Sequence, residues 1–332
     1  MTLLKVTGIS KKGEGDFLLQ AISFSQRKLE RIAIAGETGA GKSTLLKIIA
    51  GLIQPDSGEV IFENRKVTGP NENLVAGTPG IAYLSQHFEL QKFLRVEQVL
   101  SYSNNISDTV AQNLYQVCQI DHLLKRKTDQ LSGGEKQRIA ICRLLISSPR
   151  LLLLDEPFSH LDMVHKNTLK TVINEIGIKL KITCVLVSHD PHDSLSWADK
   201  IMVMKDGNII QQGTPESVYA EPASEYVGGL FGNYNLISPS MFKNYLRIPA
   251  MRSHALKAGK KSIFIRPENF KVVNRKETAI RCTVSKVSFL GGYYELEVAT
   301  SKNLLLVKTD QGNIKAGDTI YVSASRKSVW LF

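Results

Sequence analysis

The segment 36–43 constrains the fold of this chain most strongly, because its sequence GETGAGKS fits the phosphate-binding pattern G-x-x-x-x-G-K-[ST]. An apolar run at 31–35 precedes it and a helix-compatible run at 44–51 follows it, which is the strand, loop and helix order that the pattern requires. Glycines let backbone N–H groups point at phosphate oxygens, and the helix adds the positive end of its dipole. We therefore predict nucleotide binding, with Lys42 reaching the terminal phosphates and Ser43 offering a hydroxyl to Mg²⁺. The residues expected to bind the nucleotide are Gly36, Thr38, Gly39, Ala40, Gly41, Lys42, Ser43 and Thr44.

Length and composition indicate an ordinary globular protein. The 332 residues leave room for two domains, and 43% apolar residues suffice for buried cores. No apolar stretch approaches the roughly 18 residues that span a bilayer, and the first residues lack the layout of a signal peptide. The cysteines form no C-x-x-C pair, which argues against a disulfide framework or a zinc site. We expect a soluble, cytoplasmic protein.

The charge of the chain is unevenly distributed. Residues 1–234 hold 25 Lys and Arg against 25 Asp and Glu, whereas residues 235–332 hold 17 against 6. The formal net charge of +11 therefore lies entirely in the second part. Because glycines and prolines punctuate the stretch 221–232 just before this change, we predict a domain boundary between 234 and 235.

The first part has the alternation of an α/β fold. Short apolar runs at 32–35, 81–84, 151–154, 183–187 and 201–204 are typical of strands buried on both faces of a mostly parallel sheet. Strand signals are missing between positions 88 and 127, and we predict an inserted helical subdomain at about 88–150. The expected core helices are 42–51, 134–147, 164–180 and 191–198.

Further motifs narrow the nucleotide-binding prediction. The segment 131–138 reads LSGGEKQR and opens a helix, and 151–157 reads LLLLDEP and ends a strand with two carboxylates. These segments resemble the signature sequence and the Walker B strand of ATP-binding cassette (ABC) ATPases. Similarly, Ser-His-Leu-Asp at 159–162 resembles their D-loop, Gln86 their Q-loop glutamine, and His189 their switch histidine.

The resemblance implies a catalytic role for each of these residues. Asp155 is expected to hold Mg²⁺, directly or through water, and Glu156 to orient and deprotonate the attacking water. His189 is expected to bond the γ-phosphate, and Gln86 to reach both the metal and the water. The expected catalytic residues are thus Glu156, His189 and Gln86, and the expected Mg²⁺ ligands are Ser43, Gln86 and Asp155.

The resemblance also implies a dimer. In this family, the residues matching Ser132, Gly133 and Gly134 contact the γ-phosphate on a second subunit, which uses a helix N-terminus as an anion site. Asp162 belongs to the D-loop. Since the chain holds one copy of each motif, hydrolysis is expected to need a head-to-tail dimer with another copy or a paralogue, a homodimer being our prediction.

Two segments depart from the family pattern. The family stacks adenine on an aromatic residue some twenty positions before the phosphate loop, whereas the aligned place within 11–17 is not aromatic. Phe17 lies nearby and is the candidate substitute. The other departure is FELQKFL at 88–94, which replaces the more usual run after the Q-loop, on the surface where the family contacts its membrane subunit.

The C-terminal part is predicted to be an OB-like all-β barrel. Glycine-containing turns separate short runs rich in β-formers. The Ile-Arg-Pro-Glu run at 265–268 and the segment 287–291 are similar to the transport-associated OB-type domain of type I importer ATPases for sugars, polyamines, iron and oxyanions. The expected strands lie at 262–268, 280–284, 293–298, 304–307 and 319–322.

The resulting functional hypothesis is an ATP-hydrolysing subunit that drives solute import. It implies integral membrane permease subunits as partners, an indirect link to an extracytoplasmic solute-binding protein, and a position at the inner face of the cell membrane. One alternative is a soluble ABC ATPase that binds nucleic acid through its basic OB-like domain. Nucleic-acid ABC proteins, however, either split their motifs with coiled coils or carry two cassettes, and neither occurs here. The other alternative is an exporter ATPase, which only the C-terminal domain disfavours.

The basic C-terminal part suggests two further roles besides a solvated surface. An anionic effector would need converging donors, for which Arg266 beside Pro267 and Glu268 is the candidate, and we favour this regulatory hypothesis. An anionic membrane would instead need basic residues spread over one surface. The candidates for such a surface are Lys257, Lys260, Lys261, Lys271, Arg275 and Lys276.

Overall fold

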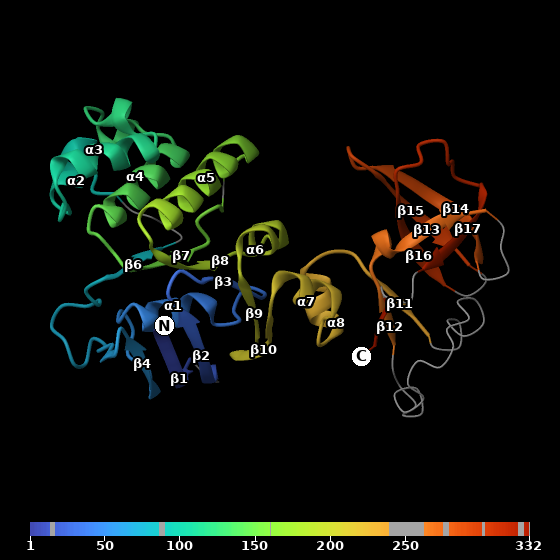
Figure 1. Ribbon diagram of the computed structural model, residues 1–332, viewed down its shortest axis with the longest axis horizontal. Helices are drawn as coiled ribbons and strands as arrows, with labels where there is room; N and C mark the ends of the chain where they lie inside the picture. The colour runs from blue at the N-terminus through green and yellow to red at the C-terminus, as the bar shows by residue number, and fades with distance from the viewer. Residues whose placement is uncertain are drawn as a thin grey trace. The chain divides into compact units, whose positions relative to one another are not determined.

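The computed structural model describes residues 1–13, 17–85, 90–159, 161–238, 262–274, 279–300, 303–324 and 329–331. Its contacts divide the chain into two compact units, Met1–Pro215 and Glu216–Phe332, coloured from blue to yellow and from yellow to red in Figure 1. Helices α7 (Pro215–Ala220) and α8 (Glu225–Leu230) fall at the start of the second unit. This division lies earlier in the chain than the boundary that the charge distribution predicts.

The first unit is built on a six-stranded sheet that is parallel except for β10, which pairs antiparallel with β9. Every residue of β7 and β8 is buried, as their continuous apolar sequences require. All five predicted strands are confirmed. In sheet order the strands are β10 (Asn208–Gly213), β9 (Lys200–Lys205), β3 (Arg31–Ala35), β8 (Thr183–Val187), β7 (Leu151–Asp155) and β6 (Ile81–Leu84).

The predicted core helices are also confirmed, with ends that differ by one or two residues. They are α1 (Lys42–Ile49), α4 (Gly133–Leu145), α5 (Met163–Lys179) and α6 (Pro191–Trp197). The segment predicted as a helical subdomain contains α2 (Val96–Ser101), α3 (Asp108–Val117) and two short 3₁₀ turns, Asp121–Leu123 and Thr128–Gln130. Figure 1 shows α2 and α3 gathered beside α4. Within the described residues, no helix is both long enough and apolar enough to cross a bilayer.

A four-stranded antiparallel sheet in the first unit was not foreseen from the sequence. Its strands bury alternate side chains such as Leu4 and Val6, which pack on one face of α1. Residues Leu45, Leu46, Ile48 and Ile49 of α1 join the same core, together with side chains from the parallel sheet. Helix α1 is therefore held between two sheets, which fixes the loop in front of it. In sheet order the strands are β2 (Phe17–Arg27), β1 (Thr2–Lys12), β4 (Ser57–Phe62) and β5 (Arg65–Lys66).

The second unit carries two all-antiparallel sheets, which agrees with the predicted all-β class. The sequence predicted five of its strands and missed β11, β13 and β18. The first sheet is β11 (Asn235–Ile237), β12 (Ile263–Ile265) and β18 (Val329–Leu331). The second is β13 (Phe270–Val273), β17 (Thr319–Ala324), β14 (Ile280–Phe289), β15 (Tyr294–Ala299) and β16 (Leu304–Thr309).

Arg266 is a structural residue, which corrects its assignment as the effector candidate. Its side chain is only 2% exposed. The guanidinium donates to the carbonyl oxygens of Tyr219 (3.1 Å), Gly228 (2.9 Å), Gly232 (2.8 Å) and Asn233 (3.1 Å), and it lies 4.1 Å from the centre of the Tyr219 ring. Burial lowers its pKa. Since backbone carbonyls satisfy its donors, Arg266 ties α7, α8 and the following turn to the residue after β12.

Of the basic residues proposed for a membrane surface, only Lys271 lies within the described residues, where it is exposed on β13. Lys257, Lys260, Lys261, Arg275 and Lys276 lie outside them. The membrane-surface hypothesis therefore stays a prediction.

We expect Arg266→Met to lower the free energy of unfolding by about 3 kcal/mol, because several buried carbonyls lose their donor. Denaturant unfolding of the full chain measures this. The matched control is Arg281→Met on β14, since Arg281 is exposed and the same substitution there should change little. Equal stability of the two variants would show that the carbonyl cluster does not depend on Arg266.

Candidate nucleotide-binding site

The phosphate loop connects β3 to α1 in a conformation that favours glycine at three of its positions. Gly36 has φ 150°, Gly39 has φ 90° and Gly41 has φ 94°. A Cβ on Gly36 would lie 2.3 Å from the carbonyl oxygen of Met204, and one on Gly41 would lie 2.6 Å from that of Leu18. The loop is therefore seated against β9 and β2, and larger residues at these two positions would displace it.

Lys42 lies at the start of α1 with only 6% exposure. Its Nζ donates hydrogen bonds to the carbonyl oxygens of Gly36 and Glu37, both at 2.7 Å. Burial lowers its pKa, and the negative charges of Glu156 and Asp155 oppose that shift. These carbonyls hold the ammonium group over the loop, where phosphate oxygens would be stronger partners.

Asp155 ends β7 and accepts hydrogen bonds on both of its carboxylate oxygens. Ser43 Oγ donates to Oδ1 at 2.9 Å, and the hydroxyl of Tyr83 on β6 donates to Oδ2 at 2.8 Å. The carboxylate is 2% exposed. Burial and the nearby carboxylate raise the pKa of Tyr83, so the phenol stays protonated and remains a donor. Tyr83 is not among the site residues predicted from the sequence, although it is the one side chain with a hydroxyl in the apolar run 81–84.

The side chains of Glu156 and His189 lie close together, and Glu156 directly follows Asp155 in the chain. Nδ1 of His189 lies 3.2 Å from Oε2 of Glu156. Glu156 has φ 49°, an uncommon value for a residue other than glycine, and its backbone N–H donates to the carbonyl of Val187 at 3.0 Å. The His189 side chain is 66% exposed, against 19% for Glu156. The pair therefore reaches from the end of the sheet toward solvent.

The signature segment forms the start of α4. Ser132 caps this helix: its Oγ accepts from the N–H of Glu135 at 3.3 Å, and Glu135 Oε2 accepts from the N–H of Ser132 at 2.8 Å. A Cβ placed on Gly133 would meet no atom within 4 Å, whereas one on Gly134 would lie 2.9 Å from His165. His165 Nδ1 in turn lies 2.7 Å from Oδ2 of Asp162. The signature and D-loop segments are thus neighbours within one chain.

The remaining predicted residues are only partly described. Thr38 is exposed on the loop and Thr44 is half-buried in the first turn of α1. Gln86 and the side chain of Phe17 lie outside the described residues, so their assignments stay predictions. In the segment after the Q-loop, Phe93 is described and is 72% exposed.

The residues present fit Mg²⁺. A serine hydroxyl and a buried carboxylate, 2.9 Å apart, supply the hard oxygen ligands that this ion prefers. Among the described residues, no cluster of three or more His, Cys, Asp and Glu side chains could form an all-protein metal cage. Mg²⁺ in nucleotide sites is usually held by one or two side chains together with phosphates and water.

Comparison with known proteins identifies the family of this chain. The ABC transporter family matches residues 19–159, and the TOBE domain family matches residues 263–332. The spermidine/putrescine import ATP-binding protein PotA of Mycoplasma mycoides subsp. mycoides is 32% identical over 317 residues, which cover 90% of this chain and 89% of that protein. The sulfate/thiosulfate import ATP-binding protein CysA of Synechocystis sp. is 32% identical over 335 residues, covering 96% of this chain and 92% of that protein.

One of the similar solved structures is a dimer with bound nucleotide. The dimeric post-hydrolysis form of the ATP-binding cassette MJ0796, bound to ADP and Pi, is similar with a TM-score of 0.57 and 26% identity, over 64% of this chain and 99% of that chain. Both of these relatives are import ATP-binding proteins that align with at least 90% of this chain, which favours import over the nucleic-acid and exporter alternatives. The chain belongs to the ABC transporter family and is an ATP-binding, ATP-hydrolysing import subunit with a C-terminal TOBE domain.

Proposed function

We propose that Glu156 is the general base for ATP hydrolysis, and that His189 orients it and contacts the γ-phosphate. The observation that carries this assignment is the 3.2 Å approach of His189 Nδ1 to Glu156 Oε2, next to the buried Asp155. A carboxylate held in this position can take a proton from an attacking water. Lys42 neutralises phosphate charge, which is the main demand of phosphoryl transfer on a protein.

We assign the Mg²⁺ ligands to Ser43 and Asp155, with Gln86 as the further ligand that the family resemblance implies. The ion would neutralise charge on the β- and γ-phosphate oxygens when bound with ATP. Asp155 supplies the negative charge, and Tyr83 holds one of its oxygens, so that the other faces Ser43. Ser43 would hold the ion through its hydroxyl oxygen, and Asp155 through its carboxylate.

The active form we propose is a head-to-tail homodimer. The space around Gly133 is open, so the positive end of α4 is free to receive phosphate from a second chain. Ser132, Gly133 and Gly134 would make this contact, while Asp162 lies beside them through His165. The similar MJ0796 cassette is a dimer, which supports this arrangement.

We assign the permease-binding surface to the helical region around α2. Phe93 is 72% exposed with φ 66°, and Tyr102 is 71% exposed at the end of α2. Exposed aromatic side chains are typical anchors of protein interfaces. Docking there would place the chain at the cytoplasmic face of the membrane, with an extracytoplasmic solute-binding protein linked only through the permease.

The relatives do not identify the cargo, because the substrates in their names differ in charge. The PotA relative is named for spermidine and putrescine, which are cations, and the CysA relative for sulfate and thiosulfate, which are anions. Both are 32% identical to this chain. The likeness therefore supports solute import and leaves the solute open.

We expect Glu156→Gln to keep ATP binding while lowering turnover by about 10²- to 10⁴-fold, the range for a positioned general base. It should also accumulate an ATP-bound dimer. Steady-state hydrolysis, equilibrium nucleotide binding and size-exclusion chromatography measure these effects. Lys42→Ala is the comparison variant and should weaken nucleotide binding itself. A Glu156→Gln chain with wild-type turnover would refute the base assignment.

The Tyr83→Phe variant tests whether the hydroxyl of Tyr83 positions the carboxylate of Asp155. Loss of the hydroxyl leaves Oδ2 without its donor, so we expect divalent-cation affinity in the ADP complex to fall about tenfold. Electron paramagnetic resonance titration with Mn²⁺ measures affinity independently of hydrolysis. Tyr115→Phe on α3 is the matched control, since Tyr115 is also half-buried and lies in the helical region. Unchanged Mn²⁺ affinity in Tyr83→Phe would contradict a positioning role.

A further inference from the structure

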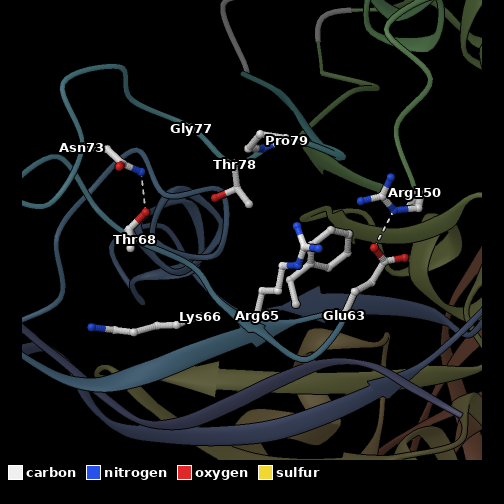
Figure 2. A pocket seen from close by; sticks show the side chains of 10 residues that line it. Glu63, Arg65, Lys66, Thr68, Asn73, Gly77, Thr78, Pro79 and Arg150 are labelled. Carbon is white, nitrogen blue, oxygen red and sulfur yellow. Dashed lines mark hydrogen bonds and ion pairs between the residues drawn. The ribbon is translucent and has the colours of Figure 1, made fainter.

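The first unit contains a polar pocket of about 580 Å³ away from the nucleotide site. Figure 2 shows its lining side chains, which come from the hairpin between β4 and β5, from the loop 67–80 and from the residue before β7. The volume falls in the range of small-molecule sites in proteins. The polar lining includes Arg65, Lys66, Thr68, Asn73, Thr78 and Arg150.

The pocket lies at the opposite end of the strands from the catalytic residues. Arg150 immediately precedes β7, whereas Asp155 ends it, and four strand steps from Leu151 to Asp155 span about 13 Å. The carbonyl oxygen of Gly80, just before β6, accepts from the N–H groups of Arg150 at 2.8 Å and Leu151 at 3.1 Å. The amino ends of β6 and β7 therefore form one wall of the pocket. Its occupant cannot be the nucleotide held at their carboxyl ends.

Arg150 is held in a fixed position at this wall. Its Nε lies 2.6 Å from Oε2 of Glu63, and its guanidinium lies 5.6 Å from the centre of the Phe62 ring. A Cβ on Gly80 would lie 2.6 Å from its Nη2, so this close approach depends on glycine. The ion pair with Glu63 is formed through Nε of Arg150. Among the described residues, no hydrogen-bond acceptor contacts the two Nη groups. Those donors are available to a ligand.

Arg65 supplies a second, unpaired guanidinium. Figure 2 shows it extending from the hairpin into the space between the Thr68–Asn73 pair and the Arg150–Glu63 pair. Among the described residues, no carboxylate or carbonyl contacts its side chain. Lys66, by contrast, pairs with Glu72 at 3.1 Å. The pocket therefore presents more donors than acceptors, and the only carboxylate in its lining, Glu63, already has a partner.

We propose that this pocket is a binding site for a small organic oxyanion, a carboxylate or a phosphate ester. Arg65 and the Nη groups of Arg150 bind the charged end, and the hydroxyl of Thr78 offers a further hydrogen bond. The loop 67–80 also contacts the residues after α1, since the N–H of Gly77 donates to the carbonyl of Gly51 at 3.3 Å. The occupant thus contacts the loop that leads into β6 and the residue that precedes β7, the strand that ends at Asp155.

Isothermal titration of the full chain tests the proposal, with ADP and Mg²⁺ added first so that the phosphate loop is occupied. Succinate and glycerol 3-phosphate are the two probes, and the one that binds identifies a carboxylate or a phosphate ester as the preferred class. We expect saturable binding at one site. Arg65→Ala should weaken it about tenfold, because a charge-assisted hydrogen bond is lost, and Arg65→Lys should restore part of the affinity.

Arg27→Ala is the matched control. Arg27 is also an exposed arginine of the antiparallel sheet, but it lies on β2, at the opposite edge from Arg65 on β5. Its loss should leave binding unchanged. The proposal is overturned if neither probe saturates, if Arg65→Ala binds like the wild-type chain, or if Arg27→Ala weakens binding as much as Arg65→Ala.

Discussion

A single buried carboxylate, Asp155, connects the elements of the nucleotide site. It is 2% exposed and accepts hydrogen bonds from Ser43 at 2.9 Å and Tyr83 at 2.8 Å. Burying a carboxylate is costly unless its oxygens are hydrogen-bonded, so both contacts are needed for Asp155 to remain where it is. They join the end of β7 to the start of α1 and to β6. The phosphate loop, the strand carrying Glu156 and the strand leading to Gln86 are thereby fixed relative to one another.

In the head-to-tail dimer that we propose, each chain supplies only half of a catalytic site. Lys42, Asp155 and Glu156 surround one end of the parallel sheet, whereas Ser132 and Gly133 begin a helix whose first turn faces open space. His165 connects that helix to the D-loop, because it packs against Gly134 and contacts Asp162 at 2.7 Å. A second chain that brings phosphate to this helix would contact both segments together. Nucleotide binding and subunit association are coupled in this arrangement.

The sequence predicted the parallel core well, because its strands are continuous apolar runs and its loops carry residue-specific motifs. The antiparallel sheet was missed, since β1 and β2 only alternate apolar and polar residues and their pairing contains register shifts. Tyr83 was missed because its role arises only when β6 lies beside β7. Arg266 was misassigned for a similar reason: a charged residue near Pro267 and Glu268 suggests a surface site. Only the packing of α7 and α8 shows that carbonyl groups bury it.

The most direct test of the shared site mixes two inactive variants. Lys42→Ala removes the phosphate-binding lysine, and Gly133→Asp places a negative charge where the partner's phosphate would approach, in open space that should leave the fold intact. In a head-to-tail dimer, an equal mixture forms half mixed dimers with one intact site each, so ATPase activity should recover to about a quarter of the wild-type rate. A mixture no more active than the two variants measured separately would contradict a site built from two chains.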